Sequence, residues 1–127
     1  MALLPPLALA AGPSLDDLKN DHRVTQSIST YGMGLGAQRW SPLTEINRDT
    51  VNHLVPAWST ALETDRGQEG QPLVYGDRIF VTTHEATFAI DARSGRMLWR
   101  NKLRYSKKMY RMVCCGFINR GPVIFDG

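Results

Sequence analysis

From residue 72 onward, short apolar runs alternate with turn residues, and this alternation restricts the fold more than any other feature of the chain. β-Branched and aromatic residues dominate the runs, as they do in β-strands. The gaps between the runs have the length of hairpin turns. The runs cover residues 73–75, 79–83, 87–90 and 97–103, and the turns are Gly76-Asp77, His84-Glu85 and Ser94-Gly95. The pattern predicts consecutive antiparallel strands and an all-β fold.

The residues before this region contain few signals for regular structure. Ser14 and the acidic Asp17 three residues later fit a helix N-cap with an acidic third position, which predicts a short N-terminal helix that ends at about Asn20. Three glycines lie between residues 32 and 36. We expect this stretch to be a loop in which backbone segments approach closely.

Length and charge exclude several classes of protein. The chain has 127 residues, 43% of them apolar, which is enough for one domain with a core. Its formal charge of +3 comes from 15 basic and 12 acidic residues, so nucleic acid is not expected as a partner. Residues 100–111 contain six basic side chains, two tyrosines and no acid. We interpret them as a solvated loop; single-stranded nucleic acid and an acidic electron acceptor are the alternative partners.

Residues 1–12 form a short apolar run that ends in Ala8-Leu9-Ala10, the pattern of a signal-peptidase site. The basic region that usually opens a signal peptide is missing, so we interpret the run as a truncated signal peptide, with a floppy apolar terminus as the alternative. The run is too short to span a bilayer, and no integral membrane segment is expected. Export would place the chain in an oxidising compartment, where disulfides persist.

Two adjacent cysteines, Cys114 and Cys115, limit the local chemistry. Their Cα atoms lie about 3.8 Å apart, which is less than the usual spacing in a relaxed disulfide. A bridge between them would close a strained eight-membered ring, and strain of this kind concentrates at functional sites. A pair of buried free thiols is the alternative. Zinc is a poor interpretation, because neither the cysteines nor His22, His53 and His84 have a metal-ligand spacing.

Several motifs occur in a fixed order along residues 30–127. They are Tyr31-Gly32-Met33-Gly34, Arg39-Trp40-Ser41-Pro42-Leu43, Ile46-Asn47, Leu54-Val55-Pro56-Ala57-Trp58, Gly67-Gln68-Glu69, Pro72-Leu73-Val74, Cys114-Cys115 and Asn119-Arg120-Gly121. In this combination the chain resembles the quinoprotein alcohol dehydrogenases, the methanol and ethanol dehydrogenases that use pyrroloquinoline quinone. Members of that family are several times longer, so the resemblance implies an amino-terminal fragment.

The resemblance implies a partial β-propeller, the first blade or so of an eight-bladed quinoprotein propeller. Residues 89–99 are similar to the tryptophan-docking repeat of these blades, in which the Asp caps a turn, the Gly has a positive φ and the Trp packs against a neighbouring blade. Trp58 resembles a weaker copy in a preceding strand. We expect residues 1–12 to be the signal peptide, 13–70 a segment that leads into the propeller, and 71–127 the first blade and the start of the next. Residues 123–125 are expected to form a strand there.

The resemblance also implies which side chains bind the cofactor. It assigns Glu69, Cys114, Cys115 and Arg120 to the quinone site, with the cysteines as a vicinal disulfide over one face of the ring. Solvated loop positions are the alternatives for Glu69 and Arg120, since charged side chains are mostly exposed. Arg120 suits a carboxylate ligand because its guanidinium is a planar fork of donors. No catalytic residue and no metal ligand is assigned to this chain.

The implied function is oxidation of a primary alcohol to an aldehyde in the periplasm, by hydride transfer to the quinone. The family uses a Ca²⁺ or lanthanide ion, and cytochrome c or a similar protein accepts the electrons. The catalytic base and metal ligands belong to later blades, so we expect the chain alone to be inactive. Gly116 stands where methanol and ethanol enzymes commonly carry Asp, which leaves the alcohol open. A non-enzymatic propeller scaffold of the cell envelope is the alternative.

The implied disulfide gives a first prediction. In exported protein, Cys114 and Cys115 should resist alkylation until a reductant is added, because the oxidising compartment keeps the bond closed. Mass spectrometry of the peptide that contains both residues, alkylated with and without prior reduction, measures this. Complete labelling of both thiols in freshly prepared, unreduced protein would show that the ring does not form.

Overall fold

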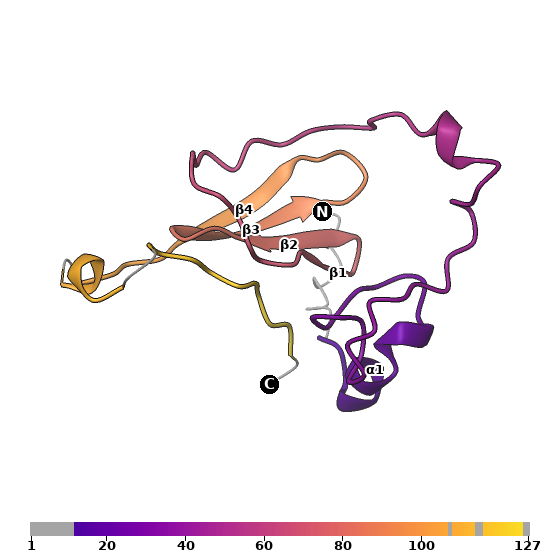
Figure 1. Ribbon diagram of the computed structural model, residues 1–127, viewed down its shortest axis with the longest axis horizontal. Helices are drawn as coiled ribbons and strands as arrows, with labels where there is room; N and C mark the ends of the chain where they lie inside the picture. Colours follow the sequence, from indigo (N-terminus) through magenta and orange to yellow (C-terminus); the bar gives the residue numbers. More distant parts are fainter. Residues whose placement is uncertain (1–11, 107, 114–115, 126–127) are drawn as a thin grey trace, which may run out of the picture.

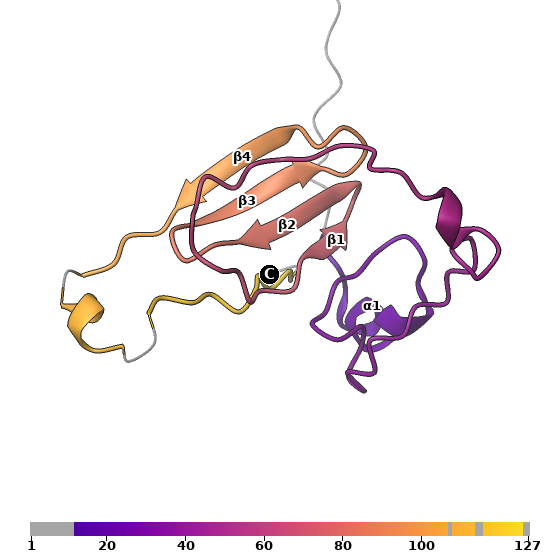
Figure 2. The ribbon, with the colours of Figure 1, turned by 45° about the horizontal axis from the view of Figure 1, so that its top comes forward.

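The computed structural model describes residues 12–106, 108–113 and 116–125. The strands of this part form a four-stranded antiparallel sheet whose spatial order follows the chain, β1-β2-β3-β4 (Figures 1 and 2). The strands are β1 Leu73–Tyr75, β2 Arg78–Thr82, β3 Ala86–Asp91 and β4 Met97–Lys102. This meander of hairpins confirms the predicted all-β fold, and a four-stranded antiparallel sheet is the blade unit of a propeller.

The turns between the strands follow from their sequences. Gly76 and Asp77 join β1 to β2 with φ angles of 56° and 57°, which is the conformation of a two-residue hairpin turn that matches the twist of the strands. His84 and Glu85 join β2 to β3, and the Thr83 amide donates to the Ala86 carbonyl over 2.8 Å. Both turns lie where the sequence predicts them.

The turn between β3 and β4 is held by Asp91. Its Oδ1 accepts hydrogen bonds from the Ser94 amide at 2.8 Å and the Ser94 hydroxyl at 2.7 Å. Gly95 closes the turn with a φ of 72° and donates its amide to the Asp91 carbonyl at 2.9 Å. The structure therefore has the Asp cap and the positive-φ Gly that the repeat implies.

Trp58 docks on this same turn. Its indole Nε1 donates to the Ala92 carbonyl over 3.2 Å, and a Cβ added to Gly95 would lie only 2.5 Å from the indole ring. Trp58 does not belong to a strand, contrary to the expectation, because the described residues offer its backbone no ladder partner. Trp99 is 45% exposed and its ring centroid lies 6.1 Å from that of Phe80 in the same sheet.

The main core cluster lies on one face of the sheet. It consists of Ala86, Phe88 and Ile90 with the partly buried Trp58, Leu62, Ile79, Val81 and Met97 packed against them. Alternate residues of β3 point to this face, and the extended segment that carries Trp58 and Leu62 covers it. The opposite face carries the buried Leu73 and Ala89 together with the half-exposed Trp99. The exposed part of Trp99 leaves apolar surface on this face, as expected for a repeat unit that stacks on neighbours.

The N-terminal segment forms a small lobe beside β1 (Figure 2). It contains α1 Leu15–Lys19 and the 3₁₀ turn η1 Asp21–Arg23, and the linker to the sheet contains η2 Val51–His53. The Ser14 hydroxyl accepts from the Asp17 amide at 3.2 Å and Asp17 Oδ2 accepts from the Ser14 amide at 2.9 Å, so the predicted helix start is confirmed. No helix among the described residues has the length and apolar character to cross a membrane.

The C-terminal segment leaves β4 through the 3₁₀ turn η3 Met109–Arg111 and returns toward β1 (Figures 1 and 2). Residues 123–125 are not a strand, which corrects the expectation. Val123 is 89% exposed and Phe125 65%. A strand requires a hydrogen-bonded neighbour, and the described residues provide none here.

The packing of Trp58 on Gly95 predicts the effect of one methyl group. Gly95→Ala should lower the free energy of unfolding by about 1–3 kcal/mol, because the Cβ overlaps the indole and the positive φ disfavours a side chain. Thermal or denaturant unfolding measures the change. Gly67→Ala is the control, since no described atom lies within 4 Å of its added Cβ. Equal stability of the two variants would contradict the docking contact.

The Asp91 cap predicts a loss of stability in acid. Hydrogen bonds from the Ser94 side chain and backbone hold the pKa of Asp91 below its ordinary value of 3.8. A carboxylate whose pKa is lower in the folded state than in the unfolded state stabilises the fold at pH values above its unfolded pKa. This stabilisation is lost as the pH falls through the folded pKa. The parent should therefore lose more stability below pH 3.8 than Asp91→Asn, measured as the melting temperature against pH. Asp77→Asn, at an exposed ion pair, should keep the parent's acid slope.

Candidate functional site

The structure brings together the two described residues that the resemblance assigns to the cofactor. Arg120 Nη1 lies 3.7 Å from Glu69 Oε2, although the residues are far apart in sequence. Both side chains face solvent, with Arg120 83% and Glu69 50% exposed. They line a cavity of about 450 Å³ that also touches Tyr31, Gln71, Leu73, Gly121, Pro122 and Val123. The predicted pair thus lies in one cavity.

A contact between two glycines sets this pair side by side. A Cβ added to Gly70 would lie 3.1 Å from the Gly121 amide nitrogen, and one added to Gly121 would lie 3.1 Å from the Gln71 carbonyl oxygen. Gly121 has a φ of 128°, which residues with side chains rarely adopt. Its amide also donates to Asn119 Oδ1 at 3.1 Å. The two backbones cross so closely that a side chain at either glycine would require them to shift, so Glu69 and Arg120 emerge next to each other.

Gln71 ties a third segment to the cavity. Its Oε1 accepts from the Gly32 amide at 3.0 Å, and its Nε2 donates to the Thr30 carbonyl at 3.3 Å. Tyr31, between these two residues, lines the cavity. Neither Gln71 nor Tyr31 was predicted to belong to the site. The available signals were that Tyr31 opens one of the motifs shared with the family and that Gln71 follows Glu69 by two residues.

Asp21 fixes the other end of the Tyr31 loop. It is fully buried and accepts hydrogen bonds from the Ser29 amide at 2.8 Å, the Thr30 amide at 3.0 Å and the Thr30 hydroxyl at 2.7 Å. Three donors satisfy a buried carboxylate that would otherwise be costly. Ile28 then forms an antiparallel bridge with Val74 of β1. The loop is therefore held by the lobe on one side and by the sheet on the other.

A second cavity, of about 350 Å³, begins on the other side of Glu69. It is lined by Arg66, Gly67, Gln68, Glu69, Gly116, Phe117 and Ile118. A Cβ added to Gly116 would lie 3.5 Å from Arg66 Nη1. Cys114 and Cys115 lie outside the described residues. Gly116, which follows them in the sequence, is one of the residues that line this cavity.

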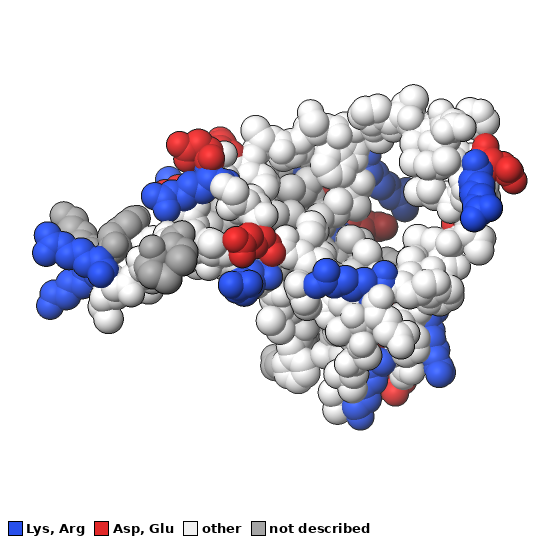
Figure 3. Space-filling view, viewed as in Figure 1, with Lys and Arg blue, Asp and Glu red and all other residues white. Residues whose placement is uncertain are grey.

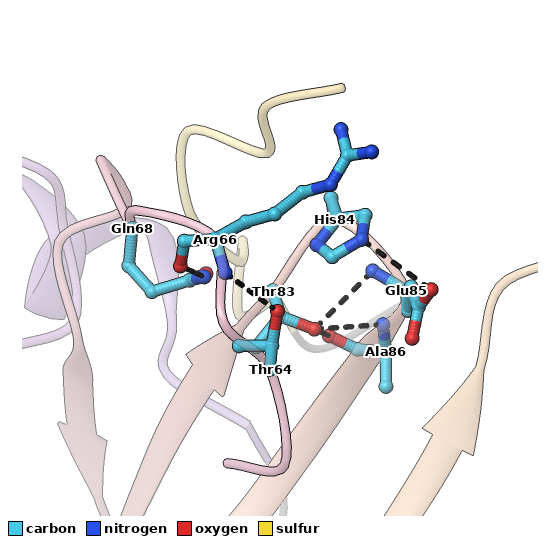
Figure 4. A network of polar contacts seen from close by, with 7 residues as sticks. All are labelled: Thr64, Arg66, Gln68, Thr83, His84, Glu85 and Ala86. Carbon is cyan, nitrogen blue, oxygen red and sulfur yellow. Dashed lines mark hydrogen bonds and ion pairs between the residues drawn. The ribbon is translucent and has the colours of Figure 1, made fainter. Parts of the chain in front are cut away.

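Polar contacts hold two turns near this cavity, one that contains Arg66 and one that contains His84 (Figure 4). Gln68 Nε2 donates to the Arg66 carbonyl at 2.7 Å, and the Thr83 hydroxyl accepts from the Ala86 amide at 3.1 Å. His84 is only 8% exposed, with its Nε2 3.4 Å from Glu85 Oε1. His84 is a turn residue, as expected, and it is buried.

The charged side chains that line the cavity are Glu69 and Arg120, and Arg120 can bind an anionic group. Arg120 is exposed and its one ion pair among the described residues, with Glu69, is long, so most of its five donors remain available. Lys and Arg side chains also gather at the end of the molecule that carries η3 (Figure 3). No group of three or more His, Cys, Asp or Glu that could hold a metal ion is present among the described residues.

The chain is similar to proteins of one known family. The PQQ family model, described as "Glucose/ethanol/alcohol dehydrogenase, beta-propeller domain", matches residues 29–121. The chain belongs to this family. The match covers the four strands and both Glu69 and Arg120.

Individual relatives are consistent with this family. 1-Butanol dehydrogenase (quinone) from Thauera butanivorans is 45% identical over 127 residues, which are 98% of this chain and 20% of the relative. Methanol dehydrogenase (cytochrome c) subunit 1 from Paracoccus denitrificans is 39% identical over 99 residues, or 76% of this chain and 16% of the relative. Among solved structures, a europium-containing methanol dehydrogenase superimposes with a TM-score of 0.76 at 25% identity, covering 85% of this chain and 19% of that one.

The chain therefore spans about a fifth of the length of the relatives it matches. The predicted family and the predicted propeller fold are confirmed. The sheet described here is the unit from which such a propeller domain is built.

Proposed function

We propose that the chain is the amino-terminal part of a periplasmic quinone-dependent alcohol dehydrogenase, in which it supplies one wall of the cofactor site. The observation that carries this proposal is the Glu69–Arg120 pair at 3.7 Å in a solvent-accessible cavity, within a family of quinoprotein dehydrogenases. The substrate is a primary alcohol, which leaves as the aldehyde. Outside its larger protein the chain is inactive.

The residues present fit pyrroloquinoline quinone, which carries three carboxyl groups. A cavity of about 450 Å³ falls within the range of sites that hold cofactors. Arg120, exposed and loosely paired, has a planar fork free for a carboxylate. The contact between Gly70 and Gly121 keeps side chains out of the space beside the pair. These features suit a flat, acidic ligand.

Each residue has a separate role in binding. The Arg120 guanidinium binds a carboxylate through paired hydrogen bonds. Glu69 accepts a hydrogen bond from a donor group of the ligand and orients Arg120 through their ion pair. Cys114 and Cys115, joined as a vicinal disulfide, cover one face of the ring and exclude water. When bound, the quinone accepts a hydride from the alcohol.

The remaining components come from outside the chain. We propose a Ca²⁺ or lanthanide ion at the quinone, with ligands in later blades; a relative of known structure is named for europium. We propose cytochrome c or a similar protein as electron acceptor, which the name of the Paracoccus denitrificans relative supports. The periplasmic location rests on the apolar residues 1–12 and on the cysteine pair. No observation favours the scaffold alternative.

Titration of the full-length apoprotein with pyrroloquinoline quinone tests the proposal. Arg120→Lys keeps the charge but loses the bidentate fork. Since a charge-assisted hydrogen bond contributes about 1.5–3 kcal/mol, cofactor affinity should fall roughly ten- to a hundredfold or more. The unfolding transition of the apoprotein should change little, because an exposed ion pair contributes about 0–1 kcal/mol.

Arg93→Lys is the matched control. Arg93 is 81% exposed and lies 3.6 Å from Asp77, so its ion pair resembles that of Arg120 but lies on the turns of the sheet. This control should bind the cofactor like the parent. A parent protein that binds no quinone would refute the proposed function, and unchanged binding by Arg120→Lys would remove Arg120 from the site.

A further inference from the structure

Tyr31 shares the cavity of Glu69 and Arg120 but has no role in the function proposed so far. Its side chain is 57% exposed, although the loop around it is firmly held. An exposed aromatic side chain on a fixed backbone is suited to contact a ligand, because little conformational freedom is lost on binding. The contacts on each side of Tyr31 show how it is held.

Gln71 grips the backbone on both sides of Tyr31. Its amide oxygen accepts from Gly32 at 3.0 Å and its amide nitrogen donates to Thr30 at 3.3 Å. One side chain therefore satisfies the peptide groups before and after Tyr31. With both flanking residues fixed, the Cα–Cβ direction of Tyr31 is fixed as well. Gln71 also lines the cavity, so the clamp and the residue it positions lie at the same site.

Arg39 determines what the Tyr31 hydroxyl can do. Its Nη2 donates to the Tyr31 hydroxyl oxygen, and its guanidinium lies 4.9 Å from the ring centroid. The Arg39 amide also donates to the Gly32 carbonyl at 2.9 Å. Because Arg39 uses the oxygen as an acceptor, the hydroxyl proton remains available to donate. A cation on the acceptor side makes the hydroxyl a better donor.

We propose that Tyr31 is a third binding residue for the ligand of Glu69 and Arg120, and that it donates its hydroxyl proton to an anionic oxygen of that ligand. Gln71 is the positioning residue that aims it. This inference rests on the proposed function, in which the ligand is a polycarboxylate quinone. With Tyr31 and Arg120 as donors and Glu69 as acceptor, the cavity presents hydrogen-bonding groups from three separate segments of the chain.

Titration of the full-length apoprotein with pyrroloquinoline quinone also tests this inference. Tyr31→Phe removes the hydroxyl and keeps the ring, and it should weaken binding about two- to tenfold, the effect of one neutral hydrogen bond. Tyr105→Phe is the matched control, because Tyr105 packs on Phe117 with ring centroids 4.9 Å apart and does not line this cavity. It should bind like the parent.

Gln71→Leu tests the positioning role. Loss of both hydrogen bonds from Gln71 should speed hydrogen exchange at the Gly32 amide. It should also weaken quinone binding by about the same factor as Tyr31→Phe. If Gln71 acts through Tyr31, the double variant Tyr31→Phe, Gln71→Leu should bind only slightly more weakly than Tyr31→Phe alone. Fully additive losses would show that Gln71 acts on the ligand in another way and would overturn the positioning role.

The outcomes separate this inference from the function on which it rests. If Arg120→Lys weakens binding and Tyr31→Phe does not, Tyr31 is not a binding residue and the proposed function stands. If the parent binds no quinone, both fall. Weaker binding by Tyr31→Phe with an unchanged Tyr105→Phe supports the inference.

Discussion

The close contact between Gly70 and Gly121 is the constraint on which the site depends. Two chain segments that are separated in sequence by the whole sheet cross there. The backbone of each segment lies where a side chain of the other segment's glycine would be. Glu69 and Arg120 flank this crossing, so their meeting is a property of the backbone and does not rely on their weak, exposed ion pair. A side chain at either glycine would require the two segments to shift by a few tenths of an ångström.

The sequence alone predicts the sheet well, because its signals are local. Strand runs and turn residues at β1 to β4 coincide with the observed elements within one or two residues, and the Ser14 cap marks the start of α1. The alternation of side chains and the demand for positive φ at Gly95 act within a few residues. Residues 123–125 were predicted wrongly, since their apolar pattern says nothing about whether a partner strand is present.

The site is only partly predictable for the opposite reason. Glu69 and Arg120 could be named through the family resemblance, but no local pattern shows that Gln71 clamps the Tyr31 loop or that Asp21 buries its carboxylate beneath that loop. Both side chains bind backbone groups eight or more residues away. Such contacts follow from the tertiary fold and leave no periodic trace in the sequence. The buried position of His84 has the same origin.

The docking of Trp58 has a consequence for the order in which the chain assembles. Its indole reaches a carbonyl 34 residues away, whereas each hairpin joins strands across a short turn. Closing the longer loop costs about 2 kcal/mol more chain entropy than closing a turn of four or five residues. The ring also has no surface to rest on until the Asp91–Gly95 turn exists. The indole can therefore dock only where that turn has formed, and its contacts then hold the turn and the Trp58 segment together. The N-terminal lobe depends on the same sheet, because Ile28 pairs with Val74 of β1.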